Sequence, residues 1–326
     1  MAHFNSELRD FLSQWFNSEP TLITHTSGST GKPSAIRIRK ADMRRSAEIS
    51  IRYFGLSARS RILLCMPMHT IAARMLVVRA IVSGAQLLCL EPKANPFEAL
   101  SEWEQIDFVS LSPYQFRCIA QSENDRPKLK RCTQILLGGS DVAPDLMDKI
   151  IELPCEVFLS YGMTETLSHV AIRKLNGEQA SEYFHLLDSY KIRRSPEGTA
   201  IIDLPWSDTP IYTNDLIELF PEHGFRLIGR KDNVINSGGV KIHMEEVESI
   251  LATYLPHPFC ITAAPHPSLG QCVAFVAPYD CQLEVLDSIL RPHNPYYVPK
   301  RIIQQEIPLR PNGKIDRAKV LHLAAE

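Results

Sequence analysis

A run of small hydroxyl residues and glycines near the N-terminus has the composition of a phosphate-binding loop. It follows an apolar, strand-like run at residues 21–23 and consists of Thr26, Ser27, Gly28, Ser29, Thr30, Gly31 and Lys32. Glycine lets successive backbone N–H groups turn toward an anion, and Ser and Thr hydroxyls add donors. The spacing is not that of a Walker A loop, because the glycines are closer together and Pro33 follows the lysine. On its own the run fits an ordinary polar surface turn equally well.

Size and composition indicate a globular protein of about two domains. The 326 residues are 44% hydrophobic and 22% charged. The formal net charge of -2 argues against a nucleic-acid-binding face or a polybasic membrane patch. The eight cysteines contain no Cys-x-x-Cys pair and several lie in apolar runs. We therefore expect reduced, buried thiols and a cytoplasmic protein.

No segment predicts a targeting signal or a membrane span. The first ten residues are polar and charged, which is not typical of a signal peptide. The most apolar stretch, residues 75–90, is interrupted by Arg79, Ser83, Gly84 and Gln86. It is too broken to cross a bilayer, so we expect no membrane insertion.

Strand-like and helix-like segments alternate through the first 180 residues. Helices are predicted at 42–53 and 70–83 and from Asn95-Pro96 onward, and buried strands at 61–66, 86–90, 107–111, 134–137 and 155–159. This alternation predicts a doubly wound α/β sheet, in which ligands lie where strands give way to loops. Such positions are taken by residues 24–33, 138–140 and 160–166.

The second half of the chain has a different pattern. Short strands and turns follow from about residue 180, and after a polar turn at 229–233 come an acidic helix at 245–255, a strand and a last helix. We predict a large N-terminal doubly wound α/β domain at 1–231 and a small, mobile α+β C-terminal domain at 232–326. The scattered histidines fit no standard metal-ligand spacing.

Short motifs recur in a fixed order along nearly the whole chain. After the loop at 26–33 come Gly138-Gly139-Ser140, Tyr161-Gly162-Met163-Thr164-Glu165-Thr166, Thr213-Asn214-Asp215, Gly229-Arg230-Lys231-Asp232, Ser237-Gly238-Gly239-Val240-Lys241-Ile242 and Pro311-Asn312-Gly313-Lys314-Ile315-Asp316-Arg317. In these motifs the chain resembles the adenylate-forming enzymes, which include acyl- and aryl-CoA ligases, peptide-synthetase adenylation domains and luciferases. Each motif is weak alone, whereas six or more in order are specific.

The resemblance implies that ATP activates a carboxylic acid to an acyl-AMP, after which a thiol, that of CoA, displaces AMP. The loop at 26–32 would hold the β- and γ-phosphates, Thr164 would donate to the α-phosphate, and Glu165 would bind Mg²⁺. Lys314 would bridge the attacking carboxylate and the α-phosphate, where charge moves in the transition state. We expect Lys314, Thr164 and Glu165 to be the catalytic residues.

The resemblance also assigns the nucleoside and the moving domain. An adenine slot would be formed by Gly138, Gly139, Ser140, Tyr161 and Gly162, with the tyrosine ring stacked on the base. Asp215 would accept from the ribose hydroxyls, with Arg230 beside it. Asp232 would be the hinge about which the C-terminal domain rotates. That rotation would bring Gly238, Gly239 and a CoA channel over the acyl-AMP.

Within the family, residues 66–69 and 164–169 look most like the o-succinylbenzoate–CoA ligases of menaquinone biosynthesis. By this resemblance His69 would border the acyl pocket and Arg79 would meet the second carboxylate of the substrate. A cation within an apolar helix is costly unless paired, so a structural ion pair with a buried acid is the alternative. Arg74 is the competing cation.

Other functions stay open. One is adenylation of a different aryl or acyl acid with transfer to CoA or a carrier protein, although residues 66–73 contain no acid to hold an amino group. Another is an inactive nucleotide-binding relative, which Lys314 and Glu165 argue against. A homodimer is also left open. The chain departs from the family at Ser34-Ala35, where Lys-Gly is usual, and at Asn214, where glycine is usual. Its N-terminal region before the loop is also much shorter, as in a compact natural form or a fragment.

Overall fold

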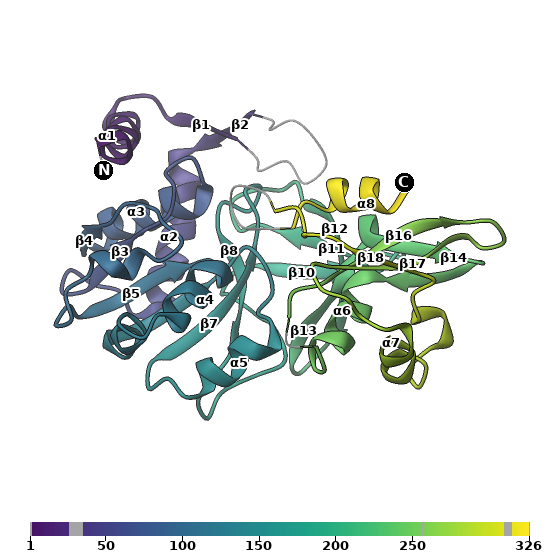
Figure 1. Cartoon of the computed structure of the whole chain (residues 1–326). Coiled ribbons are helices and arrows are strands. Elements are labelled where there is room, and N and C mark those ends of the chain that lie inside the picture. The colour runs from purple at the N-terminus through teal and green to yellow at the C-terminus, as the bar shows by residue number, and fades with distance from the viewer. Residues whose placement is uncertain (1, 26–34, 256, 310–314, 326) are drawn as a thin grey trace.

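A computed structural model describes residues 2–25, 35–255, 257–309 and 315–325 of the chain. Figure 1 shows a large sheet with its helices on one side of the molecule and the C-terminal strands and helices on the other, with the strands of a third sheet between them. The mixed α/β architecture confirms the predicted fold class.

The large sheet has seven strands in the order β4-β3-β5-β6-β7-β8-β9. Their bounds are β3 Arg61–Leu64, β4 Gln86–Cys89, β5 Ile106–Leu111, β6 Cys132–Leu137, β7 Glu156–Gly162, β8 His169–Lys174 and β9 His185–Leu186. The first five strands in this order are parallel, and β8 and β9 add antiparallel pairs. Ile62, Leu63 and Leu64 are fully buried, as expected for a parallel strand covered on both faces.

Local sequence signals set the ends of the surrounding helices. These are α2 Lys40–Phe54, α3 Ile71–Ser83, η1 Pro96–Ala99, α4 Pro113–Gln121, η2 Arg126–Arg131 and α5 Pro144–Ile151. The Thr70 side chain caps α3, and Gly84 ends it with a left-handed φ of 72°. The helix predicted from Asn95 is only a single 3₁₀ turn, although Asn95 does cap it.

The N-terminal segment contains a helix that the sequence pattern did not single out. Helix α1 (Ala2–Phe16) buries Phe4, Phe11 and Trp15. Strands β1 (Thr21–His25) and β2 (Ala35–Arg39) then pair antiparallel in a sheet of their own. The expectation that the glycine-rich loop leaves a strand of the doubly wound sheet is therefore wrong, because β1 belongs to this separate hairpin.

A four-stranded antiparallel sheet follows the large one. It comprises β10 Lys191–Arg194, β11 Thr199–Asp203, β12 Ile211–Phe220 and β13 Gly224–Arg230. The longest of its strands, β12, has a register irregularity after Leu216. Gly224 has φ 105°, and a Cβ there would lie 2.2 Å from the carbonyl oxygen of Phe184. Glycine is required at position 224, because the backbone of Phe184 passes too close for a side chain.

The C-terminal part has its own sheet and apolar cluster. Its elements are η3 Lys231–Asn233, β14 Val234–Ser237, β15 Val240–His243, α6 Met244–Ala252, β16 Cys260–His266, β17 Gly270–Ala277, α7 Leu283–Leu290, η4 Pro295–Tyr297, β18 Arg301–Gln304 and α8 Arg317–Ala325. The cluster of the first part reaches Phe225, and the next begins at Ile235. The boundary predicted near residue 232 lies between them and stays a prediction.

The cysteines are as the composition predicts. All eight cysteines are free thiols, and six of them are buried. In the part of the chain that the structure describes, none of the helices combines the length and apolarity needed to span a membrane.

Candidate functional site

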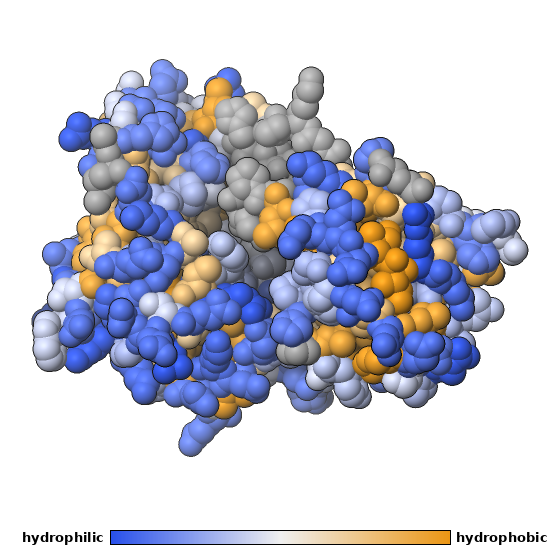
Figure 2. All heavy atoms as spheres, in the orientation of Figure 1, coloured by the Kyte–Doolittle hydropathy of each residue, from blue (hydrophilic) through white to orange (hydrophobic). Residues whose placement is uncertain are grey.

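Several of the predicted site residues lie at the ends of β6 and β7 and at the start of the β12–β13 pair. The face seen in Figure 2 is largely hydrophilic and is hollowed between the two parts of the molecule. The site residues belong to two polar groups, which we call the hinge network (Tyr161, Asn214, Asp215, Arg230 and Asp232) and the buried arginine cluster (Ser50, Arg79, Ser168, His169 and Tyr190).

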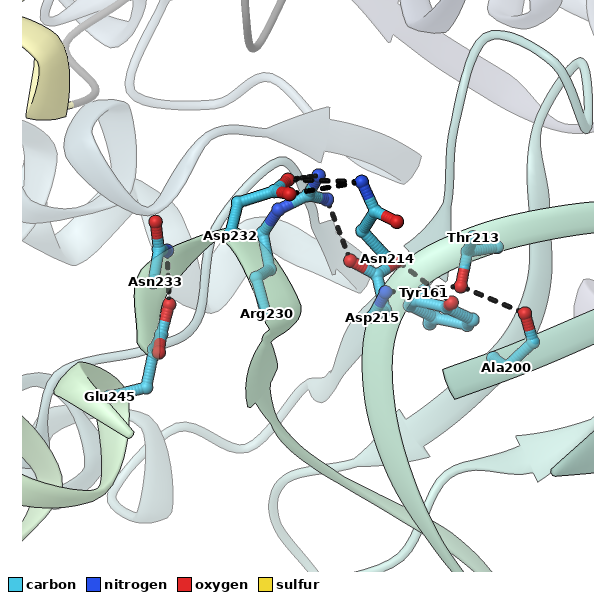
Figure 3. A network of polar contacts seen from close by, with 9 residues as sticks. All are labelled: Tyr161, Ala200, Thr213, Asn214, Asp215, Arg230, Asp232, Asn233 and Glu245. Carbon is cyan, nitrogen blue, oxygen red and sulfur yellow. Dashed lines mark hydrogen bonds and ion pairs between the residues drawn. The ribbon is translucent and has the colours of Figure 1, made fainter. Parts of the chain in front are cut away.

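The hinge network joins three predicted site residues to the predicted hinge (Figure 3). The Tyr161 hydroxyl donates to Asp215 Oδ2 at 2.9 Å. Arg230 donates from Nη1 to Asp215 Oδ1 at 2.7 Å and from Nη2 to Asp232 Oδ2 at 2.9 Å. Its guanidinium therefore bridges the two carboxylates. Because two anions face it, the pKa of Arg230 is raised even though burial opposes this, with Asp215 contributing most.

Tyr161 is enclosed rather than open. Only 6% of its surface is exposed, and its ring packs edge-on against Phe225 with centroids 5.5 Å apart. Burial, followed by the charge of Asp215, raises the pKa of the phenol, which stays a donor at neutral pH. The tyrosine thus helps Arg230 to orient Asp215. Its predicted stacking on a base stays a prediction.

Asp232 is tied back to the strands before it. Asn214 Nδ2 lies 3.1 and 3.2 Å from the two carboxylate oxygens of Asp232. The next residue, Asn233, is bound in the other direction, because its Nδ2 lies 2.5 Å from Glu245 Oε1 on α6. Consecutive residues of η3 therefore contact opposite parts of the molecule.

The glycines predicted in the adenine slot have structural reasons of their own. A Cβ on Gly138 would lie 2.5 Å from Ser160 Oγ, and one on Gly162 would lie 2.3 Å from the carbonyl oxygen of Ser168. Gly139 has a left-handed φ of 96°. Ser140 is exposed beside them. The close backbone approach at Gly162 and the positive φ at Gly139 therefore favour glycine with or without a nucleotide.

The turn between β7 and β8 presents Thr164 and Glu165. Thr164 is half-buried and Glu165 is exposed. Thr166, which the sequence analysis gave no role, is fully buried and its hydroxyl accepts from the Met163 N–H at 2.9 Å. Leu167 adopts a left-handed φ of 67°, a strained conformation for a branched side chain. Among the described residues, no cluster of three metal-ligating side chains is present, and the role of Glu165 stays a prediction.

Arg79 lies at the centre of the buried arginine cluster. Only 2% of it is exposed, its Nη2 donates to Ser168 Oγ, and its Nε has no hydrogen-bond partner in the described part of the chain. Burial lowers its pKa to about 10, and the nearby Tyr190 opposes this. No ion pair joins it to an acid of the described residues, so the structural ion pair considered as the alternative is not found there.

Neutral polar groups surround this cation. His169 Nε2 lies 2.5 Å from Ser50 Oγ, and its Nδ1 lies 3.3 Å from Ser168 Oγ. Burial, followed by the charge of Arg79, holds the pKa of His169 well below its usual range. Burial raises the pKa of Tyr190 to about 12. Sequence reasoning missed these residues, because neither serine nor histidine stands out singly without knowing which segments meet.

The remaining predicted residues are partly placed. Arg74, the competing cation, donates to the carbonyl oxygens of Met68 and Ile23 at 3.0 and 2.8 Å and so braces β1 against α3. His69 is exposed just before α3. Gly238 and Gly239 form the turn between β14 and β15 with φ 59° and 88°. The loop at Thr26 to Lys32 and Lys314 lie outside the described residues.

A family model for AMP-binding enzymes matches residues 12–186, more than half of the chain. The chain belongs to the AMP-binding enzyme family. A 2-succinylbenzoate–CoA ligase of Haemophilus influenzae is 27% identical to this family member over 246 residues, which are 71% of this chain and 53% of the relative. The chain thus spans about half the length of that relative.

Solved structures of family members agree with the fold. An acyl-CoA synthetase (AMP-forming)/AMP-acid ligase II-like protein from Dyadobacter fermentans is 32% identical, with a TM-score of 0.67, and the match covers 99% of this chain and 95% of that one. An o-succinylbenzoate–CoA synthetase from Bacillus subtilis, solved with ATP and magnesium, is 20% identical with a TM-score of 0.75 and is covered over 69% of its length. That second likeness concerns the fold alone.

Proposed function

We propose that this AMP-binding enzyme activates a carboxylic acid with ATP and Mg²⁺ to an acyl-AMP and transfers the acyl group to CoA. We further propose that the acid is o-succinylbenzoate. The general reaction is supported by the family match and by the order of the motifs. The acid is supported by the 2-succinylbenzoate–CoA ligases among the relatives and, above all, by Arg79.

Arg79 is the observation on which the choice of acid rests. A buried guanidinium with an unpartnered Nε and no acidic partner among the described residues is costly to keep in a protein. A second carboxylate on the substrate would compensate that charge with charge-assisted hydrogen bonds. o-Succinylbenzoate has two carboxylates, so one can react while the other binds Arg79.

The hinge network fits the nucleoside. Asp215 has each oxygen occupied once by protein donors, and each oxygen keeps a further lone pair for a ribose hydroxyl. Tyr161 and Arg230 hold the carboxylate in place before the nucleotide arrives, which lowers the reorganisation needed on binding. Glu165 is exposed and makes no hydrogen bond or ion pair within the described part, so its carboxylate fits a hard cation such as Mg²⁺.

In the proposed first step, an oxygen of the substrate carboxylate attacks the α-phosphorus of ATP and pyrophosphate leaves. Thr164 donates to the α-phosphate and Lys314 stabilises the charge that moves between the two anions. Bound Mg²⁺ would neutralise phosphate charge. In the second step the CoA thiol releases its proton to solvent and its sulfur bonds to the acyl carbon, while the bond from that carbon to the AMP oxygen breaks and AMP leaves.

A pyrophosphate-exchange assay over a panel of acids tests the proposal. With o-succinylbenzoate, ATP and Mg²⁺ we expect exchange, and with CoA we expect the thioester and AMP. Benzoate and monocarboxylic aryl acids serve as matched acids without the second anion. Exchange with these acids but not with o-succinylbenzoate would contradict the choice of substrate, and exchange with none would contradict the adenylating activity.

A further inference from the structure

Asn214 stands where the resemblance in the motifs leads us to expect glycine, and the structure shows what its side chain does. It extends from β12 over the hinge turn, and its Nδ2 faces both carboxylate oxygens of Asp232, at 3.1 and 3.2 Å (Figure 3). Glycine has no side chain and could not make this contact. The hydrogen bond therefore depends on the asparagine side chain.

Asp232 is held from two sides. Besides Asn214, the guanidinium of Arg230 donates to Asp232 Oδ2 at 2.9 Å. Both donors belong to the β12–β13 pair, which precedes the hinge. Two donor side chains on one carboxylate fix its direction better than a single exposed ion pair, which contributes little by itself.

The same contacts connect the hinge to the ribose carboxylate. Arg230 binds Asp215 through Nη1 and Asp232 through Nη2, and Asn214 and Asp215 are consecutive residues of β12. Arg230 therefore links the carboxylate of Asp215 directly to that of Asp232. On the other side, Asn233 binds Glu245 of α6 and couples the hinge to the C-terminal part.

We propose that Asn214 is a positioning residue that holds Asp232 against the β12–β13 pair and thereby sets the balance between the adenylating and thioester-forming arrangements. This inference rests on the proposed two-step function. Asn214 touches neither substrate nor reacting atoms. It acts through Asp232, by stabilising the domain arrangement seen here relative to one in which η3 has turned.

Two substitutions weaken the contact between Asn214 and Asp232 to different degrees. Asn214→Ala removes the amide, and we expect hydrogen–deuterium exchange at residues 231–233 to quicken about three- to tenfold, the loss of one net hydrogen bond. Asn214→Asp keeps the shape but sets a carboxylate against that of Asp232, for which we expect about tenfold or more. In both variants the ratio of pyrophosphate exchange to thioester formation shifts in step with hinge exchange, while the KM for ATP stays within about twofold.

Two control variants test whether the effects come from this contact and not from the added charge or a damaged fold. Asn5→Asp on α1 makes the same charge change away from the hinge and should leave every readout unchanged. The double variant Asn214→Asp/Asp232→Asn restores one amide and one carboxylate, and we expect it to recover part of the hinge protection lost in Asn214→Asp.

Hydrogen–deuterium exchange at the hinge and adenylation of the acid panel test the role of Asn214 and the proposed function separately. Hinge exchange and a half-reaction ratio equal to those of the native chain in both Asn214 variants would overturn the inference. A native chain that adenylates no acid of the panel, with hinge exchange nonetheless quickened as expected, would contradict the proposed function and leave the contact with Asp232 established. An altered KM for ATP with unchanged hinge exchange would assign Asn214 to nucleotide binding and overturn the positioning role.

Discussion

The hinge network and the buried arginine cluster both centre on an arginine, yet they treat its charge in opposite ways. Arg230 is about a third exposed and bridges two carboxylates of the chain. Arg79 is almost fully buried and is surrounded by serine, histidine and tyrosine, with no acidic partner in the described residues. A compensated, exposed charge organises the protein itself. An uncompensated, buried charge is retained at a cost that a bound anion would offset.

The largest expected effect comes from removing the carboxylate that the hinge network holds. Asp215→Ala leaves Tyr161 and Arg230 without their shared acceptor and removes the proposed ribose contact. Each charge-assisted hydrogen bond is worth roughly 1.5–3 kcal/mol, so we expect kcat/KM for pyrophosphate exchange to fall at least about a hundredfold. Near-native exchange would remove the nucleotide from this network. Circular dichroism would check that the fold is kept.

Substitution of each arginine by methionine tests the comparison directly. Arg79→Met should raise the KM for o-succinylbenzoate about a hundredfold, the loss of a charged hydrogen-bonded pair, with little change for monocarboxylic acids. Its melting temperature should not fall, because a buried cation is replaced by an apolar side chain of similar length. Arg230→Met, the matched control, should lower the melting temperature, since it leaves the carboxylates of Asp215 and Asp232 without the cation that bridges them. The reverse order of stabilities would break the comparison.

The pH dependence of stability tests whether His169 is neutral within the buried arginine cluster. His169 has a folded-state pKa well below its ordinary value of about 6.5, so the unfolded chain binds the extra proton first as the pH falls. Stability from this group is therefore present above pH ~6.5 and is lost below it, by up to about 1.4 kcal/mol per pH unit until the folded-state pKa is reached. Urea unfolding of the native chain and His169→Gln at pH 7 and pH 5.5 measures the difference. Parallel pH dependences in the two proteins would contradict this account.

The smallest effect is expected at Tyr161. Tyr161→Phe keeps the packed ring and removes one hydrogen bond to Asp215, while Arg230 still holds that carboxylate. We expect about a tenfold rise in the KM for ATP, measured in the exchange assay, which is the low end of the roughly 1.5–3 kcal/mol of a hydrogen bond to a charged group because Arg230 stays bound. A loss as large as that of Asp215→Ala would mean that the tyrosine, and not the arginine, orients the carboxylate.

The sequence predicted elements and motif positions where local physics decides them. The apolar runs at 61–66 and 107–111 became β3 and β5, and Gly84 ended α3 as its freedom at positive φ predicts. It did not single out α1, whose buried Phe4, Phe11 and Trp15 are spread among charged residues. It also placed the glycine-rich loop on the large sheet, because a run such as residues 21–23 does not reveal which strand it pairs with.

The sequence by itself determined which chemistry this protein could do, through residue types and the order of its motifs. Only the tertiary structure decided which polar groups meet. Arg79 and Ser168 are 89 positions apart and Asn214 and Asp232 are 18 apart, yet each pair is in hydrogen-bond contact. Periodicity and capping act over a few residues, whereas such contacts depend on how strands pair and helices pack across the whole chain. That is why the sequence showed an arginine that needed a partner, and the fold showed that the described chain supplies no acid for it.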